Sequence, residues 1–192
     1  MSSEKKEQKV EYDIARLAND TRDYWKFKPR SDFHCIISCI ISQRIKIEDS
    51  RSILKKLYIL LNENEFTREN ICSLTNDELL DIGITTSKLS TIRDVCKLED
   101  ITEKKLISIK GIGPWTIKAW KLMMNKKGNV ILDTDKYILA RCKELCNETS
   151  LTFLNDKDDE DKRNIINFLW RIKPEGIIKI KNQLELTRLD FL

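Results

Sequence analysis

Apolar residues recur at intervals of three and four along most of the chain, the spacing that places them on one face of an α-helix. Glycine and proline, which interrupt helices, number only five and three in 192 residues. This pattern predicts an all-α protein with helices over residues 10–17, 32–42, 48–61, 67–72, 76–81, 88–97, 102–109, 114–125, 136–146, 163–172 and 176–186. The most apolar of these segments, 32–42, is expected to be a buried central helix.

The polar segments predict where the chain is not helical. Residues 1–10 are charged and are expected to form a disordered tail, and the acidic stretch 155–162 predicts an exposed loop. Asn76 is the expected N-cap of the helix over 76–81.

The size and net charge of the chain exclude few classes of protein. The 192 residues, 41% of them hydrophobic, suffice for one domain or for two small lobes that share a cleft. No apolar run approaches the ~20 residues of a membrane span, and residues 1–8 do not form a signal peptide, so we expect a soluble intracellular protein. The net charge of +4 fits nucleic-acid binding or simply a lysine-rich surface.

Six cysteines lack the paired spacing of a metal site and lie mostly in helical patterns, which predicts reduced core thiols rather than disulfides: Cys35, Cys39, Cys72, Cys96, Cys142 and Cys146. His34 is the only histidine. A single histidine gives little support for a histidine-ligated zinc site or a Ser-His-Asp triad, and we predict no metal cluster.

The segment 102–125 has the pattern of a helix, a tight glycine turn and a second helix. Thr102 is the expected cap of the first helix, and Pro114 suits the first position of the second. Between them, Gly111 and Gly113 allow backbone angles closed to other residues and a close approach by a partner. The second helix then presents backbone N–H groups at the positive end of its dipole, which suits a phosphate.

A carboxylate segment follows about two dozen residues after this turn. The apolar triplet 130–132 leads into Asp133, Thr134 and Asp135, and the helix over 136–146 comes next. One aspartate is expected to cap that helix.

These motifs resemble the helix-hairpin-helix DNA glycosylase superfamily, and within it the 3-methyladenine DNA glycosylase II branch. The likeness rests on Gly-Ile-Gly-Pro-Trp-Thr at 111–116 and on Val-Ile-Leu-Asp-Thr-Asp at 130–135, followed by Tyr-Ile-Leu at 137–139. Weaker elements agree in order at 40–44, 83–88 and 170–174, so the resemblance covers about residues 24–175. It implies two helical lobes around a cleft: one is 31–130, ending with the hairpin, and the other combines 11–30 with 136–192.

The resemblance implies a monomeric DNA-repair enzyme, nuclear in a eukaryote, that flips a damaged base out of duplex DNA and hydrolyses its N-glycosidic bond. Asp135 matches the catalytic position, where a carboxylate stabilises the sugar as it becomes cationic. Asp133 is the rival if the segment is aligned on the Val-Asp-Thr-His form of the endonuclease III branch. Whichever aspartate is not catalytic is expected to be the helix cap.

Trp115 stands where glycosylases with strand-cleaving activity carry a Schiff-base lysine. This predicts a monofunctional enzyme, with Lys118 and Lys121 as alternative amines. Trp115 is either a core aromatic of the hairpin or a wall of the base pocket. Three further aromatic residues are candidates for that pocket or for the core: Tyr24, Trp25 and Trp120.

The resemblance also implies how DNA is held. A phosphate is expected on the amides of Gly111, Gly113 and Trp115, with charge from Lys110 and Lys118. Gln43 and Arg44 occupy the place of the wedge that fills the space left by the flipped base, or are solvated turn residues. Lys88 belongs to the turn before the hairpin and is a further candidate for DNA contact.

No cofactor is expected to be required, although hairpin carbonyls in the family often hold a monovalent cation. Two other functions remain open. One is a bifunctional glycosylase/lyase acting on oxidised bases, and the other is a non-catalytic hairpin module that only binds DNA.

Overall fold

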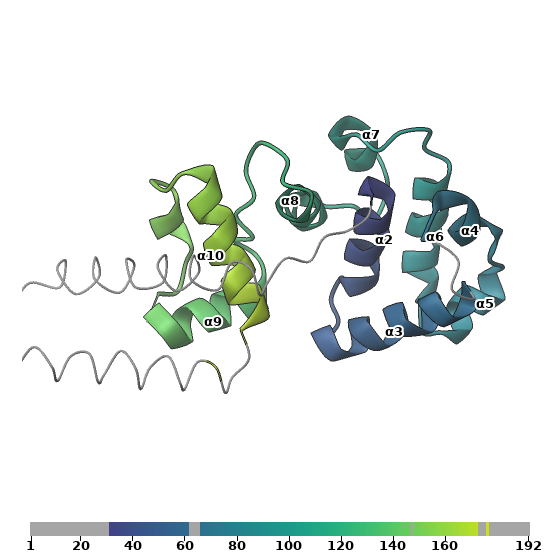
Figure 1. Ribbon diagram of the computed structural model, residues 1–192, viewed down its shortest axis with the longest axis horizontal. Helices are drawn as coiled ribbons and strands as arrows, with labels where there is room; N and C mark the ends of the chain where they lie inside the picture. Colours follow the sequence, from purple (N-terminus) through teal and green to yellow (C-terminus); the bar gives the residue numbers. More distant parts are fainter. Residues whose placement is uncertain (1–30, 62–65, 147, 173–175, 177–192) are drawn as a thin grey trace, which may run out of the picture. The chain divides into compact units, whose positions relative to one another are not determined.

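The computed structural model describes residues 31–61, 66–146, 148–172 and 176, and the regular elements in that part of the chain are all helices (Figure 1). They are α2 (Asp32–Ser42), α3 (Ile47–Leu60), α4 (Arg68–Ser73), α5 (Asn76–Asp81), α6 (Thr86–Cys96), α7 (Glu103–Ile107), α8 (Pro114–Met123), α9 (Lys136–Cys146), the 3₁₀ helix η2 (Thr152–Leu154) and α10 (Asp159–Arg171). The all-α prediction is confirmed. None of the described helices is long and apolar enough to cross a membrane.

Several predictions lie outside the described residues. They concern Tyr24, Trp25, the tail over 1–10 and the helices over 10–17 and 176–186. The described part of the chain falls into two compact units that meet in sequence between Lys126 and Lys127. The first unit holds α2 to α8, and the second holds α9, η2 and α10.

Helix α2 is the centre of the first unit, as its sequence predicts. Every residue from Phe33 to Ile41 is buried, and the helix packs against α3, α6 and α8 (Figure 1). A helix that is apolar on all sides is stable in water only when other elements surround it. The remaining core of this unit is mostly aliphatic, with Leu57, Ile71, Leu79, Ile92, Val95 and Leu106 almost fully buried.

The predicted cap of α5 is wrong by one residue. Thr75, not Asn76, is the N-cap, and its hydroxyl accepts a hydrogen bond from the N–H of Glu78 at 3.2 Å. The Glu78 carboxylate in turn accepts from the N–H of Thr75 at 2.7 Å. This reciprocal capping box satisfies two N–H groups that a single cap would leave open.

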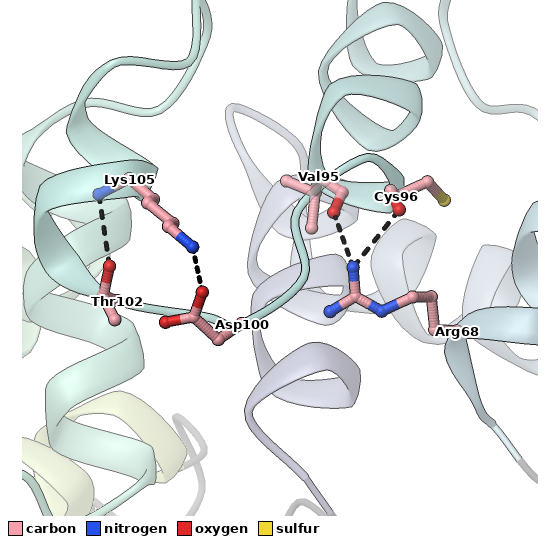
Figure 2. A network of polar contacts seen from close by, with 6 residues as sticks. All are labelled: Arg68, Val95, Cys96, Asp100, Thr102 and Lys105. Atoms are coloured by element: carbon pink, nitrogen blue, oxygen red, sulfur yellow. Dashed lines mark hydrogen bonds and ion pairs between the residues drawn. The ribbon is translucent and has the colours of Figure 1, made fainter.

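Two arginines connect the short helices to α6. Arg68 donates to the carbonyls of Val95 and Cys96 at the end of α6, at 3.4 and 3.2 Å (Figure 2). Arg93, which lies in α6, donates to the carbonyls of Cys72 in α4 and of Leu74 just after it. Figure 2 also shows the start of α7, where Lys105 contacts Asp100 and its N–H is capped by Thr102.

The cysteine prediction is wrong for one pair. Cys72 in α4 and Cys96 in α6 form a disulfide, with Cα atoms 6.1 Å apart. Packing of α4 on α6 brings them together across 24 residues of sequence, which no short spacing motif records. Cys35, Cys39 and Cys142 are buried free thiols, as predicted. A hydrogen bond with Cys35, together with burial, raises the pKa of the Cys39 thiol well above its ordinary value.

The second unit is built on the contact between α9 and α10. Its apolar core includes Val130, Leu132, Ile138, Leu154, Ile165 and Ile166. Helix α10 begins at Asp159 with Asp158 as its N-cap, so part of the predicted acidic loop is helical. Three acidic residues in the first turn interact favourably with the positive end of the helix dipole, which explains why this polar segment starts a helix.

Candidate functional site

The predicted helix–glycine hairpin–helix is present in the first unit. Helix α7 is capped by Thr102, and α8 starts with Pro114 after the N-cap residue Gly113. Between the helices, Ile109 and Ile112 are 8% and 7% exposed, and the N–H of Ile112 donates to the Ile109 carbonyl at 3.1 Å. These two isoleucines anchor the turn to the core, while Gly111 stays on its exposed side.

The two glycines of the hairpin have different roles. Gly111 has φ +96°, and a Cβ on it would overlap the hydroxyl of Thr91. Gly113 has φ −108°, which any residue adopts, and nothing lies within 4 Å of the place a Cβ would occupy. The prediction of a special backbone angle therefore holds for Gly111 and is wrong for Gly113, where the missing side chain leaves open surface instead.

Two side chains from outside the hairpin hold it: Gln43, which directly follows α2, and Thr91 in α6. Gln43 Nε2 donates to the Gly111 carbonyl at 3.0 Å and to Thr116 Oγ1 at 2.8 Å. The Thr91 hydroxyl lies 3.0 Å from the Lys110 carbonyl and 3.1 Å from that of Ser87. Sequence reasoning missed Thr91 and Thr116, because their partners lie 19 and 73 residues away and no local motif connects them.

Lys88 and Arg44 differ in how far their side chains are engaged. Lys88 Nζ donates to the Ile41 carbonyl near the end of α2 at 2.6 Å, and burial lowers the pKa of this lysine. Lys88 thus supports the hairpin's neighbour α2. Arg44 is exposed and has φ +55°, a conformation that is uncommon for a residue with a side chain.

The other candidates on the hairpin and α8 range from exposed to buried. Lys110 is exposed, whereas Trp115 and Lys118 are half-buried. Lys121 forms an ion pair with Glu103 at 2.7 Å, with 14% of its side chain exposed.

Trp120 is a core residue of the first unit. Its ring is 3% exposed and therefore has little surface to offer a base. The indole N–H donates to Asp32 Oδ1 at 2.8 Å, and the ammonium of Lys126 lies 4.7 Å from the ring centroid. This cluster joins the end of α8 to the start of α2.

The carboxylate segment lies in the second unit. Asp135 Oδ1 accepts hydrogen bonds from the N–H groups of Tyr137 and Ile138, at 2.9 and 3.1 Å, and so caps α9. Asp133 lies in an exposed turn. The cap and the first candidate for catalysis are therefore the same residue, whereas the sequence predicts a different aspartate for each role.

Tyr137 and Arg141 support the start of α9. The Tyr137 hydroxyl donates to the Ile172 carbonyl at the end of α10 at 3.2 Å, and the Arg141 guanidinium lies 4.7 Å from the Tyr137 ring centroid. Because Tyr137 also donates its N–H to Asp135, the carboxylate is attached to the packed α9–α10 pair.

In the part of the chain that the structure describes, neither metal-ligand groups nor the cavity given below adds a further candidate. In the described residues, no group of three or more His, Cys, Asp and Glu side chains could hold a metal ion. A cavity of about 370 Å³ in the second unit is lined by Gly128, Asn129, Ile131, Asn155, Asp159 and Lys162, and neither Asp133 nor Asp135 is among these residues. In the hairpin, the carbonyls of Ile109, Lys110 and Gly111 all accept hydrogen bonds. Each of these carbonyl oxygens has a second lone pair besides the one that accepts the hydrogen bond.

Similar folds occur among DNA glycosylases. The chain aligns with the 3-methyladenine DNA glycosylase from Archaeoglobus fulgidus at a TM-score of 0.62 and 22% identity, over 73% of this chain and 57% of that one. A DNA-3-methyladenine glycosidase from Bacillus halodurans aligns at a TM-score of 0.49 and 21% identity, over 80% of this chain and 74% of that one. No protein-family profile and no curated protein sequence matches the chain. The first likeness shows the fold, and the chain spans a little over half the length of that glycosylase.

Proposed function

We propose that this protein is a DNA glycosylase that hydrolyses the N-glycosidic bond of an alkylated purine such as 3-methyladenine. The observation that carries the proposal is the Asp135 carboxylate, held by two amides at the start of α9. It follows a helix–glycine hairpin–helix whose Gly113 position is open to a partner. The fold shared with a 3-methyladenine DNA glycosylase supports the same reaction class.

Asp135 acts on the sugar of a flipped-out nucleotide. As the base leaves, positive charge develops on the sugar, and a carboxylate near it lowers the energy of that state. An adenine methylated at N3 carries a positive charge while it is attached to the sugar, so it takes the electrons of the broken glycosidic bond and leaves as a neutral base. Water then adds to the anomeric carbon and gives up one proton to the solvent. The two amide hydrogen bonds hold the carboxylate in one orientation, so little reorganisation is needed during the reaction.

The hairpin binds the DNA backbone. Amide N–H groups at the start of α8 face a phosphate, and the open position of Gly113 allows the close approach that such a contact needs. Lys110 and Lys118 add positive charge beside it. Arg44 enters the space left by the flipped base, because Gln43 is already bonded to the hairpin while Arg44 is exposed beside it.

The hydrolytic reaction is supported by the surroundings of α8. Trp115 stands at the place of the Schiff-base lysine, and the amine of Lys121 is paired with Glu103. This amine would have to leave its ion pair with Glu103 before it could attack a sugar. A monovalent cation on the hairpin carbonyls would add positive charge near the phosphate; comparing DNA binding in potassium and tetramethylammonium chloride tests this.

The decisive experiment uses duplex oligonucleotides that each carry one alkylated purine, incubated with wild type, Asp135→Asn and Asp133→Asn. Asparagine keeps an acceptor oxygen for the two amides and removes the charge, so Asp135→Asn is expected to stay folded and to lose about 100-fold or more in excision rate. Asp133→Asn is the matched control and is expected to retain wild-type activity. Circular dichroism melting checks that all three proteins have similar Tm.

Each alternative has its own outcome. Loss of activity in Asp133→Asn alone would move catalysis to Asp133, and DNA binding without abasic sites in any substrate would favour a non-catalytic module. Borohydride trapping of a covalent protein–DNA adduct would favour the glycosylase/lyase. Strand breakage only after alkali is the result expected for simple hydrolysis.

A further inference from the structure

We infer that Gln43 is a positioning residue that prepares the hairpin for DNA by fixing its backbone, rather than a residue that contacts the damaged site. The inference rests on the proposed function, because it explains what keeps the hairpin in the conformation that is proposed to bind a DNA phosphate. It starts from the two hydrogen bonds of the Gln43 amide, to the Gly111 carbonyl and to Thr116 Oγ1.

The two contacts lie on either side of the phosphate-binding segment. Gly111 precedes the segment, and Thr116 lies in the first turn of α8 and is 2% exposed. A primary amide has exactly two N–H donors on one nitrogen, and both have a partner here. Gln43 therefore closes a bracket around residues 112–115, which include the Gly113 and Trp115 amides proposed to meet the phosphate.

This bracket matters because the segment contains Gly113 and directly follows Gly111. Glycine has more backbone freedom than any other residue, and a flexible loop must lose that freedom when it binds. With both ends tied to one side chain, much of the ordering is already done in the free protein. Preorganisation of this kind raises affinity without adding a contact to the ligand.

The residue that holds the bracket is itself firmly placed. Gln43 directly follows α2, and its own N–H donates to the Ile40 carbonyl at 3.3 Å. Residues 33–41 of that helix are buried, and Lys88 binds the Ile41 carbonyl. Thr91 adds a second support by contacting Lys110, the residue before Gly111.

Gln43→Met is the sharpest test, because methionine has a similar length and no charge but donates no hydrogen bond. We expect binding of an undamaged duplex to weaken about 10-fold, and binding of a lesion-bearing duplex to weaken by the same factor. The single-turnover excision rate at saturating DNA should stay within about 2-fold of wild type, since the positioning affects binding and not bond cleavage. A direct contact with the lesion site would instead weaken only the lesion-bearing duplex.

Thr116→Val and the double variant complete the experiment. If Gln43 and Thr116 act as one bracket, the double variant should bind almost as well as the weaker single variant, so the losses will not add. Gln43→Glu, which keeps the shape but has no N–H donor, serves as the second variant if methionine disturbs folding. Unchanged binding of undamaged DNA, a loss confined to the lesion-bearing duplex, or additive losses would each overturn the inference. Excision by wild type tests the proposed function separately, so the two failures are distinguishable.

Discussion

At the scale of single residues, some features of the hairpin can be predicted from its sequence and others cannot. The Gly-Ile-Gly-Pro pattern correctly predicts a tight turn followed by a helix that begins with proline. It does not predict that Gly111 alone requires a left-handed backbone, or that Thr91 lies against it. Those facts depend on a neighbour 20 residues away in sequence, which local patterns cannot place.

Gly111→Ala is expected to destabilise the first unit by about 2 kcal/mol. Roughly half of that comes from the positive φ, and the rest from overlap of the new methyl group with the Thr91 hydroxyl. Thermal denaturation should show a Tm several degrees below that of wild type. Gly113→Ala is the matched control and should melt at or slightly above the wild-type Tm, since its φ suits alanine.

The double variant Gly111→Ala/Thr91→Ala separates the two causes. It removes the overlapping hydroxyl but keeps the unfavourable backbone angle, so its Tm should still lie below that of Thr91→Ala alone. Equal Tm values for Gly111→Ala and wild type would contradict the described geometry.

At the scale of helices, the caps explain why some helix starts follow from the sequence and others do not. Four successive helices, α4 to α7, begin after a threonine whose hydroxyl accepts from a backbone N–H in the first turn: Thr67, Thr75, Thr85 and Thr102. For α5, the Thr-x-x-Glu spacing of a capping box was present in the sequence and outweighs the asparagine that follows. For α10, the acidic run predicts an exposed loop, but acidic residues also favour the first turn of a helix, and the helix begins at Asp159.

The capping box of α5 predicts a pH-dependent contribution to stability. Hydrogen bonds from the backbone N–H and hydroxyl of Thr75 lower the pKa of Glu78 below its usual 4.5. Since the folded-state pKa is the lower one, the stabilisation is fully present above pH 4.5 and is lost as the pH falls through the folded-state value. Glu78→Gln keeps the shape without the charge, so the Tm advantage of wild type over Glu78→Gln should shrink on acidification from pH 7 to pH 3.

Melting curves of the two proteins at several pH values provide the measurement. Because Glu78 is fully exposed, the difference should also decrease with added salt. Parallel Tm–pH profiles would show that the box does not depend on the charge of Glu78.

At the scale of the whole molecule, periodicity predicted most of the helices in the described residues and their order, and the all-α fold is similar to that of a solved DNA glycosylase. What it could not predict are contacts between distant segments. Gln43 meets Gly111 across 68 residues, and Asp32 meets Trp120 across 88. Such contacts depend on how whole helices pack. A helical repeat shows which face of a helix is buried, but it does not show which other helix covers that face.

The disulfide is the distant contact with the clearest consequence for stability. Cys72 and Cys96 are both half-buried, so a small-molecule reductant can reach the bond. For a closed loop of this length the bond is expected to contribute about 3 kcal/mol to the free energy of unfolding. Dithiothreitol should therefore lower the Tm of wild type by several degrees.

Cys72→Ser provides the control, because it should melt at the lower temperature whether or not reductant is present. Arg68 and Arg93 still connect α4 to α6 in that variant, so it is expected to fold. A wild-type Tm that is insensitive to dithiothreitol would mean that the two thiols are reduced in solution, as the sequence alone predicts.

The cluster of Trp120, Asp32 and Lys126 has a spectroscopic consequence. An indole that is 3% exposed, with its N–H on a carboxylate, should fluoresce at short wavelength and be shielded from dissolved quenchers such as iodide. Trp115, half-buried at the start of α8, should be quenched more readily and should change its emission when a nucleobase stacks nearby. In a fluorescence titration with an oligonucleotide, Trp120 would thus supply a constant background, and Trp120→Phe would remove that light at the cost of the hydrogen bond to Asp32.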